Sequence, residues 1–163
     1  MIQTILFSTA DLCDDHGDLV QVADPIFRDF GGATGFSGPI ATVRVFDDNT
    51  SVRALLETAG AGRVLVVDND GSRRCALVGD QLAQLACDNG WAGIVVNGCV
   101  RDSAALATMP IGIKALATMP RRSEKSGPGQ VDVPVIFAGL SFEPGLVLYA
   151  DADGVILAAR RLE

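Results

Sequence analysis

The sequence predicts a single α/β domain over residues 1–163, with a mixed sheet and helices. Short apolar runs that are rich in β-branched residues alternate with segments in which apolar residues recur at helical spacing. Turns that contain glycine or aspartate separate these runs, and no linker-like stretch divides the chain. A length of 163 residues is that of one ordinary domain.

The first predicted elements are a short helix and a strand. A helix is expected after Ser8 and Thr9, because a hydroxyl at this position can accept a free amide of the first turn. Residues 30–39 are rich in glycine and are expected to form a loop. Residues 40–46 alternate in polarity and are β-branched, which indicates a strand.

A second helix and a buried strand follow. Asp48 and Asn49 can cap a helix over residues 50–59, whose apolar side chains share one face and which Gly60 ends. The uninterrupted apolar run at residues 63–68 is typical of a strand that is buried on both faces. Together these segments predict a strand–helix–strand start to the domain core.

The middle of the chain is predicted to form a strand at residues 75–78, a helix at 81–89, a strand at 93–97 and a short helix at 103–108. A strand–helix–strand connection of this length joins parallel neighbours of one sheet. The loops after the two strands should therefore lie side by side, at the sheet edge where ligands bind in open α/β folds.

The C-terminal third is predicted to be mostly strand, at residues 111–116, 133–137, 146–149 and 155–158. The polar residues 121–130 are expected to form a surface loop. The pentapeptide Leu-Ala-Thr-Met-Pro occurs at residues 106–110 and again at 116–120. Two copies this short do not indicate a repeat architecture, whose period is about 20–50 residues, so the recurrence is interpreted as coincidence.

The composition is that of a globular and acidic protein. Hydrophobic residues make up 48% of the chain, and the formal net charge is −7. An acidic chain lacks the positive field that attracts phosphates, so binding to nucleic acid or to an anionic membrane is not expected, whereas a basic protein partner is compatible. No apolar run is long enough for a transmembrane helix, and the N-terminus lacks the basic region of a signal peptide.

The four cysteines are predicted to be free, buried thiols of a cytoplasmic protein. Cys13, Cys75, Cys87 and Cys99 form no C-x-x-C pair, and His16 is the only histidine, so the spacing of a zinc site is absent. Without an export signal, a reducing compartment is expected.

Two carboxylates and a guanidinium are expected to meet at the two adjacent loops. Asp80 lies on the first loop, and Arg101 and Asp102 follow on the second after twenty intervening residues. Arg101 can hold a planar oxyanion with two donors. Asp102 is a hard oxygen ligand that suits Mg²⁺ or Mn²⁺. The pattern thus predicts a site for an anionic ligand and a divalent cation.

The first loop adds an anion site at the start of a helix. Gly79 allows a sharp turn and the close approach of a ligand. The amides of Asp80, Gln81 and Leu82 are free donors of a helix N-terminus, to which a carboxylate could bind. The set suggests a small 2-oxo acid, with its carboxylate on the amides and its keto oxygen on Arg101 and a metal.

A structural interpretation of the same residues is also open. Asp80 and Asp102 could each cap a helix, which stabilises a protein by about 1 kcal/mol. Arg101 and Asp102 could form a surface ion pair worth about 0–1 kcal/mol. On spacing alone this interpretation has the greater weight, because aspartate is common at helix starts.

Four stretches carry a resemblance to a known family. They are FGGATGFSGPIATVRVFDDN at 30–49, GRVLVVD at 62–68, RCALVGDQLAQLACDNGWAGIVVNGCVRD at 74–102 and YADADGVIL at 149–157. Together they resemble the regulator-of-ribonuclease-activity-A family, which includes the class II 4-hydroxy-4-methyl-2-oxoglutarate aldolases. The resemblance covers nearly the whole chain, and it implies the swivelling β/β/α fold and a homotrimer with active sites between subunits.

The resemblance also implies roles for the residues of the two loops. The backbone of Gly79, Asp80, Gln81 and Leu82 would bind the substrate carboxylate, and Arg101 would bind the keto oxygen and stabilise an enolate. Asp102 would hold the divalent metal, Mg²⁺ or Mn²⁺, and Asp80 would orient a metal-bound water or take part in proton transfer. The implied reactions are cleavage of 4-hydroxy-4-methyl-2-oxoglutarate and decarboxylation of oxaloacetate, which share a pyruvate enolate.

The positions of the lysines and the absence of two acidic residues of the family are relevant to this implied mechanism. Lys114 and Lys125 are the only lysines and neither lies in the two loops, which favours a metal over an imine mechanism. Residues 144–146 read Pro-Gly-Leu where the family has Pro-Gly-Asp. The chain stops at Glu163, before the extension by which many aldolases supply a glutamate to the neighbour's metal, so the source of that acidic group stays open.

A second class of function stays open beside the lyase. Some members of the family regulate a ribonuclease, and an acidic trimer could bind and inhibit a ribonuclease of the RNase E type through a basic segment. The residues Asp80, Arg101 and Asp102 are dispensable for such binding but are intact here, which favours the enzyme. A methyl-donor fold is not predicted, because no G-x-G-x-x-G motif opens a β-α-β unit.

Overall fold

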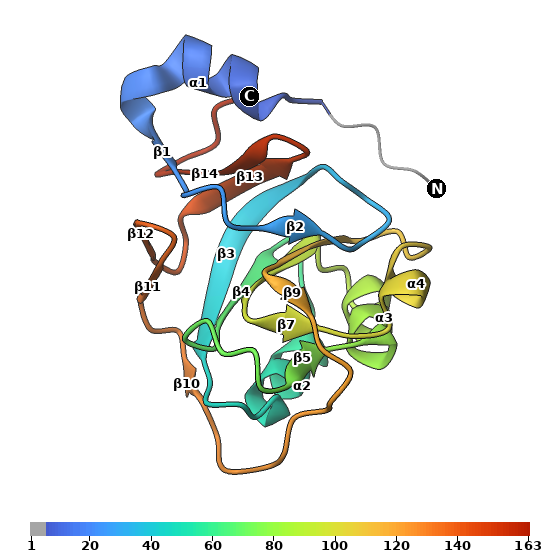
Figure 1. The fold of residues 1–163 in the computed structure, drawn as a ribbon. Helices are drawn as coiled ribbons and strands as arrows, with labels where there is room; N and C mark the ends of the chain where they lie inside the picture. Colours follow the sequence, from blue (N-terminus) through green and yellow to red (C-terminus); the bar gives the residue numbers. More distant parts are fainter. Residues whose placement is uncertain (1–5) are drawn as a thin grey trace.

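The computed structural model describes residues 6–163 and shows a mixed α/β fold (Figure 1). The helices are α1 (Thr9–His16), the 3-10 turn η1 (Gly17–Leu19), α2 (Thr50–Leu56), α3 (Asp80–Asp88) and α4 (Ser103–Leu106). The large sheet has the spatial order β1 (Val20–Val22), β14 (Gly154–Ala158), β13 (Val147–Asp151), β3 (Phe36–Arg44), β4 (Val64–Asp68), β6 (Gly93–Asn97), β8 (Gly112–Ala115) and β2 (Arg28–Asp29). The short strand β10 (Gln130–Val131) also pairs with β3.

Two smaller pieces complete the architecture. A small parallel sheet is formed by β5 (Ala76–Val78), β7 (Cys99–Val100) and β9 (Ala117–Thr118). A hairpin is formed by β11 (Val135–Phe137) and β12 (Leu140–Phe142). Helices α2 and α3 and the small sheet pack on one face of the large sheet, and the hairpin packs on the other. The predicted mixed sheet with helices, in the β/β/α manner, is confirmed.

The loop predicted over residues 30–39 is wrong for its second half, because β3 already begins at Phe36. The first half of β3 pairs antiparallel with β13, and its second half pairs parallel with β4. The ring of Phe36 is buried against Gly93 and Gly112, and a Cβ atom added at either glycine would overlap the ring. The start of β3 is therefore stabilised by residues that are distant in sequence. The local glycines alone predict a loop, so the sequence pattern did not reveal the strand.

The other predicted elements are confirmed with shifted ends. Ser8 caps α1 by accepting the amide of Asp11 at 3.3 Å. The second helix ends at Leu56 and not at residue 59, because the chain turns there through bonds such as the Thr58 amide to the Leu55 carbonyl oxygen. Residues 1–5, part of the stretch predicted to lack an export signal, lie outside the described residues.

One topological prediction is wrong, because β5 and β6 do not pair. Strand β6 lies between β4 and β8 in the large sheet, whereas β5 pairs parallel with β7 in the small sheet. The chain leaves β6 and forms β7 before it reaches the second loop, a step that the sequence pattern did not reveal. The two loops are neighbours all the same, because the parallel pairing of β5 and β7 brings the carboxyl ends of these strands together.

The two ends of the described chain meet at one side of the large sheet (Figure 1). Strand β1 pairs antiparallel with β14, and the Thr9 amide and hydroxyl donate to the Asp151 carboxylate at 2.7 Å and 2.6 Å. The turn at residues 151–154 is a tight hairpin between β13 and β14. No helix within residues 6–163 has the length and apolar character needed to cross a membrane.

Candidate functional site

The loops that follow β5 and β7 meet and bring the predicted site residues together. The Arg101 amide donates to the Val78 carbonyl oxygen at 2.9 Å. The Asp80 amide donates to Oδ2 of Asp102 at 3.0 Å. Two loops that are separated by twenty residues of sequence are therefore joined by two hydrogen bonds.

Asp102 has a strained backbone, and its side chain is bonded to the neighbouring loop. Its φ and ψ angles are 59° and 40°, the left-handed region that costs a residue other than glycine about 1–2 kcal/mol. It occupies the cap position of α4, yet its side chain makes no capping bond to that helix and accepts the Asp80 amide instead. The hypothesis that Asp102 caps a helix through its side chain is thus wrong.

Asp80 and Arg101 are also free of the structural roles that were considered for them. Gly79 is the cap residue of α3, and Asp80 is the first residue of the helix proper. No salt bridge within residues 6–163 joins Arg101 to Asp102 or to another carboxylate. The expected surface ion pair is therefore not formed, and the Arg101 guanidinium can meet a ligand.

Gly79 is required for a reason other than a sharp turn. Its φ and ψ are −131° and −162°, extended angles that any residue adopts. A Cβ at this position would lie 2.5 Å from Oδ2 of Asp102 and 3.3 Å from Cγ of Arg101. The missing side chain thus makes room for the two residues of the neighbouring loop.

The anion site at the start of α3 has fewer free donors than predicted. The Asp80 amide is already bonded to Asp102. The amides of Gln81 and Leu82 make no hydrogen bond within the described part of the chain. Two adjacent donors at the positive end of a nine-residue helix therefore stay available to a carboxylate.

A cavity of about 360 Å³ opens over these loops, a size within the range of small-molecule sites. It is lined by Asn49, Arg53, Ala76, Leu77, Gly79, Asp80, Gln81, Leu82, Arg101, Asp102, Arg122 and Lys125. Four of these side chains are cationic and two are carboxylates, although the whole chain carries a net charge of −7. A local surplus of positive charge favours an anionic ligand.

The two lysines differ in their positions. Lys114 is buried in β8, where its Nζ lies 3.0 Å from the Asp29 carboxylate and donates to the Asp151 carbonyl oxygen at 2.6 Å. Lys125 lies on the polar loop 121–130, yet it lines the cavity. The sequence pattern did not identify Lys125 and Arg122 as site residues, and the high polarity of their loop was the only signal that they offered.

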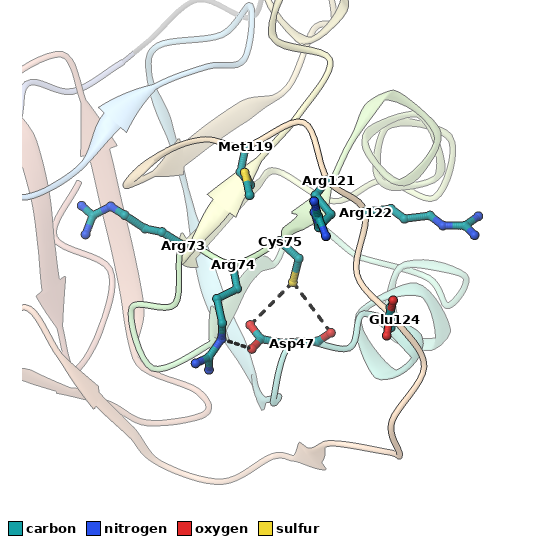
Figure 2. A pocket seen from close by; sticks show the side chains of 8 residues that line it. All are labelled: Asp47, Arg73, Arg74, Cys75, Met119, Arg121, Arg122 and Glu124. Atoms are coloured by element: carbon teal, nitrogen blue, oxygen red, sulfur yellow. Dashed lines mark hydrogen bonds and ion pairs between the residues drawn. The ribbon is translucent and has the colours of Figure 1, made fainter.

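A second cavity of about 620 Å³ adjoins the first and shares Arg122 with it (Figure 2). Its Asp47 carboxylate pairs with Nε of Arg74 at 2.9 Å and accepts the Asn69 side-chain amide at 3.0 Å. The Cys75 thiol lies 3.5 Å from Oδ1 of Asp47. Figure 2 shows Arg74 turned toward Asp47 and Arg122 extended away from it.

Burial makes the cysteines near these cavities poor nucleophiles. Cys75 is buried, and burial together with the charge of Asp47 raises its pKa to about 11. Burial also raises the pKa of the Cys99 thiol, although Arg73 opposes the shift. All four cysteines are free thiols as predicted, but Cys13 and Cys87 are only partly buried. Cys99 is therefore not proposed as a catalytic residue.

The carboxylates fit a hard divalent cation such as Mg²⁺ or Mn²⁺ better than zinc. Within residues 6–163 no three histidine, cysteine or acidic side chains cluster as metal ligands. Mg²⁺ is commonly held by one or two carboxylates together with waters and substrate oxygens. Asp102 can supply such a carboxylate, and Asp80 can bind a water of the ion, since both side chains are exposed to solvent and line the cavity.

Comparisons with known proteins point to one family. A family model described as Aldolase/RraA matches residues 9–157. A relative from Alkalilimnicola ehrlichii, provisionally named 4-hydroxy-4-methyl-2-oxoglutarate aldolase, is 56% identical and covers 94% of this chain and 96% of its own. A relative from Laribacter hongkongensis with the same provisional name is 58% identical over 92% of this chain and 94% of its own.

Two solved structures superpose on this chain with a TM-score of 0.93. One, from Geobacillus kaustophilus, is named S-adenosylmethionine:2-dimethylmenaquinone methyltransferase; it is 54% identical and the match covers 96% of this chain and 97% of that one. The other is the RNA-processing inhibitor RraA from Thermus thermophilis, which is 45% identical over 98% of this chain and 96% of its own. These relatives share a fold, but their names describe three different functions: an aldolase, a methyltransferase and an inhibitor of RNA processing.

Proposed function

The chain belongs to the RraA-like family, and from this premise we propose that it is a divalent-metal-dependent carbon–carbon lyase. Its proposed substrates are 4-hydroxy-4-methyl-2-oxoglutarate, which is cleaved to two molecules of pyruvate, and oxaloacetate, which loses CO₂ to give one. The observation that supports the proposal is the meeting of Arg101, Asp102 and the two free amides of α3 in one positively charged cavity.

The proposed substrate is held at two points. Its 2-oxo carboxylate binds the amides of Gln81 and Leu82, where the helix dipole favours negative charge. Arg101 donates to the keto oxygen, on which negative charge develops when the bond between C3 and C4 breaks. The Arg101 guanidinium has no carboxylate partner within the described residues, so it is available to stabilise the negative charge on this oxygen.

The proton balance assigns a role to Asp80. In the cleavage reaction the C4 hydroxyl loses its proton, the C3–C4 bond breaks, and the electron pair forms an enolate over C2 and C3. We place Asp80 as the group that accepts this proton and later returns one to C3. Oxaloacetate gives the same enolate once CO₂ has left, so one arrangement of residues serves both reactions.

Asp102 is proposed to hold Mg²⁺ or Mn²⁺ beside the keto oxygen. When bound, the ion supplies a Lewis acid that polarises this oxygen. An imine mechanism through Lys125 is the competing route, because this lysine lines the cavity. The two routes differ in their response to chelators and to borohydride.

The test is the release of pyruvate from each substrate, coupled to lactate dehydrogenase, with Mg²⁺ and then with EDTA. We expect turnover that EDTA abolishes, that Mg²⁺ restores and that Asp102→Ala lacks. Borohydride added during turnover should leave no adduct on Lys125. No turnover above the background of metal alone, from a folded protein, would contradict the lyase.

Methyl transfer, suggested by the name of the Geobacillus structure, has less support from this chain. The lining of the cavity contains no aromatic residue on which an adenine ring could stack. The chain also has no G-x-G-x-x-G motif. The lyase therefore remains the function that the geometry supports best.

Regulation of a ribonuclease is a second proposed function, favoured by the likeness to the Thermus RNA-processing inhibitor. The net charge of −7 suits a basic partner segment. Immobilised protein should then retain a ribonuclease of the RNase E type at low salt and release it as salt rises. The absence of binding at low salt would count against this function.

A homotrimer in the cytoplasm completes the proposal. Four free thiols suit a reducing compartment. Light scattering should give three times the chain mass of 17.0 kDa, and a monomer mass would contradict the trimer.

A further inference from the structure

The proposed lyase chemistry leaves two cations of the cavity without a role. Arg122 and Lys125 line it together with Asp80, Arg101 and Asp102. Neither cation forms a salt bridge within residues 6–163. Unpaired cations in a substrate cavity are suited to bind an anionic group of the substrate.

Two other ionic side chains near these cations are accounted for. Arg53 also lines the cavity, but its Nε lies 3.0 Å from the carboxylate of Glu57, one turn along α2. Glu124 lies on the same loop as the two cations and lines the neighbouring cavity only. The free positive charge on this side of the cavity therefore belongs to Arg122 and Lys125.

The loop that carries both cations is held at its beginning by the small sheet. The Arg121 carbonyl oxygen accepts the Ala76 amide at 2.7 Å, and Arg122 forms a bridge with Ala76 in the parallel sense. The segment thus runs beside β5, whose carboxyl end leads into the site. The Arg122 side chain extends away from Asp47 (Figure 2).

A buried carboxylate holds the far side of the same loop. Oδ2 of Asp48 accepts the amides of Ser126 and Gly127 at 2.6 Å and 2.9 Å. Its Oδ1 accepts the amide and the hydroxyl of Thr50 at 2.7 Å and 2.6 Å. Asp48 is only 2% exposed, so it ties the residues next to Lys125 to the start of α2.

The Asp48 carboxylate keeps its charge over a wide pH range. Burial alone would raise its pKa, but the hydrogen bonds from Thr50, Gly127 and Ser126 outweigh burial and lower the pKa to about 2. A third contact, from the Gly129 amide to Oγ of Ser51 at 2.8 Å, supports the same side of the loop. Although the loop is polar in sequence, these hydrogen bonds hold its backbone in place.

We infer that Arg122 and Lys125 are specificity-determining residues that bind the second carboxylate of a dicarboxylic 2-oxo acid, with Asp48 as the residue that positions them. This inference rests on the proposed function. The first carboxylate occupies the amides of α3 and the keto oxygen occupies Arg101, so a chain of four or five carbons must place its far end elsewhere in the cavity. The only other free cations that line the cavity, among the described residues, are these two.

The experiment compares two substrates that differ only at the far end. 4-Hydroxy-4-methyl-2-oxoglutarate carries a carboxylate where 4-hydroxy-4-methyl-2-oxopentanoate carries a methyl group, and both release pyruvate. In Lys125→Met, the ratio of kcat/KM for the dicarboxylate to that for the monocarboxylate should fall about tenfold. It should fall further in the double variant Arg122→Met, Lys125→Met, and KM for the dicarboxylate should rise more than kcat changes.

The control variant is Arg121→Met, which removes the same charge from the same loop but lines only the second cavity. Added salt should lower the ratio in the wild type and have little effect in the double variant, because the two cations are exposed. If Lys125→Met and Arg121→Met lower the ratio equally, or if the wild type shows no preference, the inference is wrong.

A binding measurement separates this inference from the proposed function. Calorimetry with 2-oxoglutarate and with 2-oxopentanoate compares the same pair of end groups without turnover. Tighter binding of 2-oxoglutarate that Lys125→Met abolishes supports the carboxylate site, even if the lyase assay is negative. Equal affinities for the two acids overturn it, even if the lyase assay is positive.

Asp48→Asn tests the positioning role. Exchange of the Ser126 and Gly127 amides with deuterium should become faster, and the substrate ratio should fall as in Lys125→Met. If this variant does not fold, Ser51→Ala removes only the Gly129 contact and should have a smaller effect in the same direction. Faster amide exchange with an unchanged ratio would show that Asp48 has a structural role alone.

Discussion

The two adjacent cavities share Arg122, but they differ in the bonding of one charged side chain in each, Asp47 in the second cavity and Arg101 in the first. In the second cavity, Asp47 is held by Arg74, Asn69 and Cys75. In the first, the Arg101 guanidinium has no carboxylate partner within the described residues. Polar groups that satisfy one another stabilise a fold, whereas groups held in place without partners indicate where a ligand binds.

The sharpest test of this comparison is Arg101→Ala. Pyruvate release should fall about 10²–10³-fold, because a donor to the developing enolate oxygen is lost. Thermal unfolding should change little, since Arg101 makes no salt bridge with another described residue. Arg160→Ala, at an exposed arginine outside both cavities, is the matched control. Full activity in Arg101→Ala would break the comparison.

Gly79→Ala should lower activity by about ten- to a hundredfold, since displacements of about 1 Å have effects of this order. Its Cβ would lie 2.5 Å from Oδ2 of Asp102, so the carboxylate must leave the Asp80 amide. The extended backbone angles of Gly79 suit alanine, and the fold should persist. Gly154→Ala, with open space around the added carbon, is the control. Equal activities in the two variants would contradict the role given to Gly79.

Asp47→Asn should have the opposite pattern, with stability lost and pyruvate release kept. Burial would raise the Asp47 pKa, but hydrogen bonds from Ser72, Asn69, Arg74 and Cys75 lower it below 3.8. Its stabilisation is therefore complete above about pH 4 and is lost as pH falls through the lowered pKa. Urea unfolding should show a loss of about 1–2 kcal/mol at pH 7 and a smaller one at pH 3. A loss that is larger at pH 3 would refute the assignment.

Cys75 should give the smallest effect, on thiol reactivity alone. A pKa of about 11, against an ordinary 9.0, leaves about 100-fold less thiolate at pH 8. Under native conditions a disulfide reagent should therefore modify the partly exposed Cys13 well before Cys75. Rapid labelling of Cys75, identified by peptide mapping, would mean that the second cavity is reactive and not structural.

Local sequence was sufficient for the site residues that follow strands. The apolar runs at β4 and β6 identified buried strands, and the turns after residues 78 and 98 placed Asp80, Arg101 and Asp102. Arg122 and Lys125 could not be found in this way. Their position depends on Asp48, more than seventy residues earlier, which accepts the amides of their loop.

The repeated pentapeptide shows why such features escape prediction. At residues 106–110 it ends α4, and at 116–120 it supplies strand β9. The second copy is drawn into the small sheet by β7, whose Val100 carbonyl oxygen accepts the Met119 amide at 2.9 Å. The same five residues thus form the end of a helix in one place and a strand in the other, because the segments that they pack against differ.

The pairing of β1 with β14 has a consequence for how the protein is made. Val20–Val22 leaves the ribosome long before its partner Gly154–Ala158, which follows far along the chain. At about 5–20 residues per second, the first strand waits on the order of ten seconds for the last. During translation the edge of the nascent sheet is therefore open, and it closes only after Gly154–Ala158 has been synthesised.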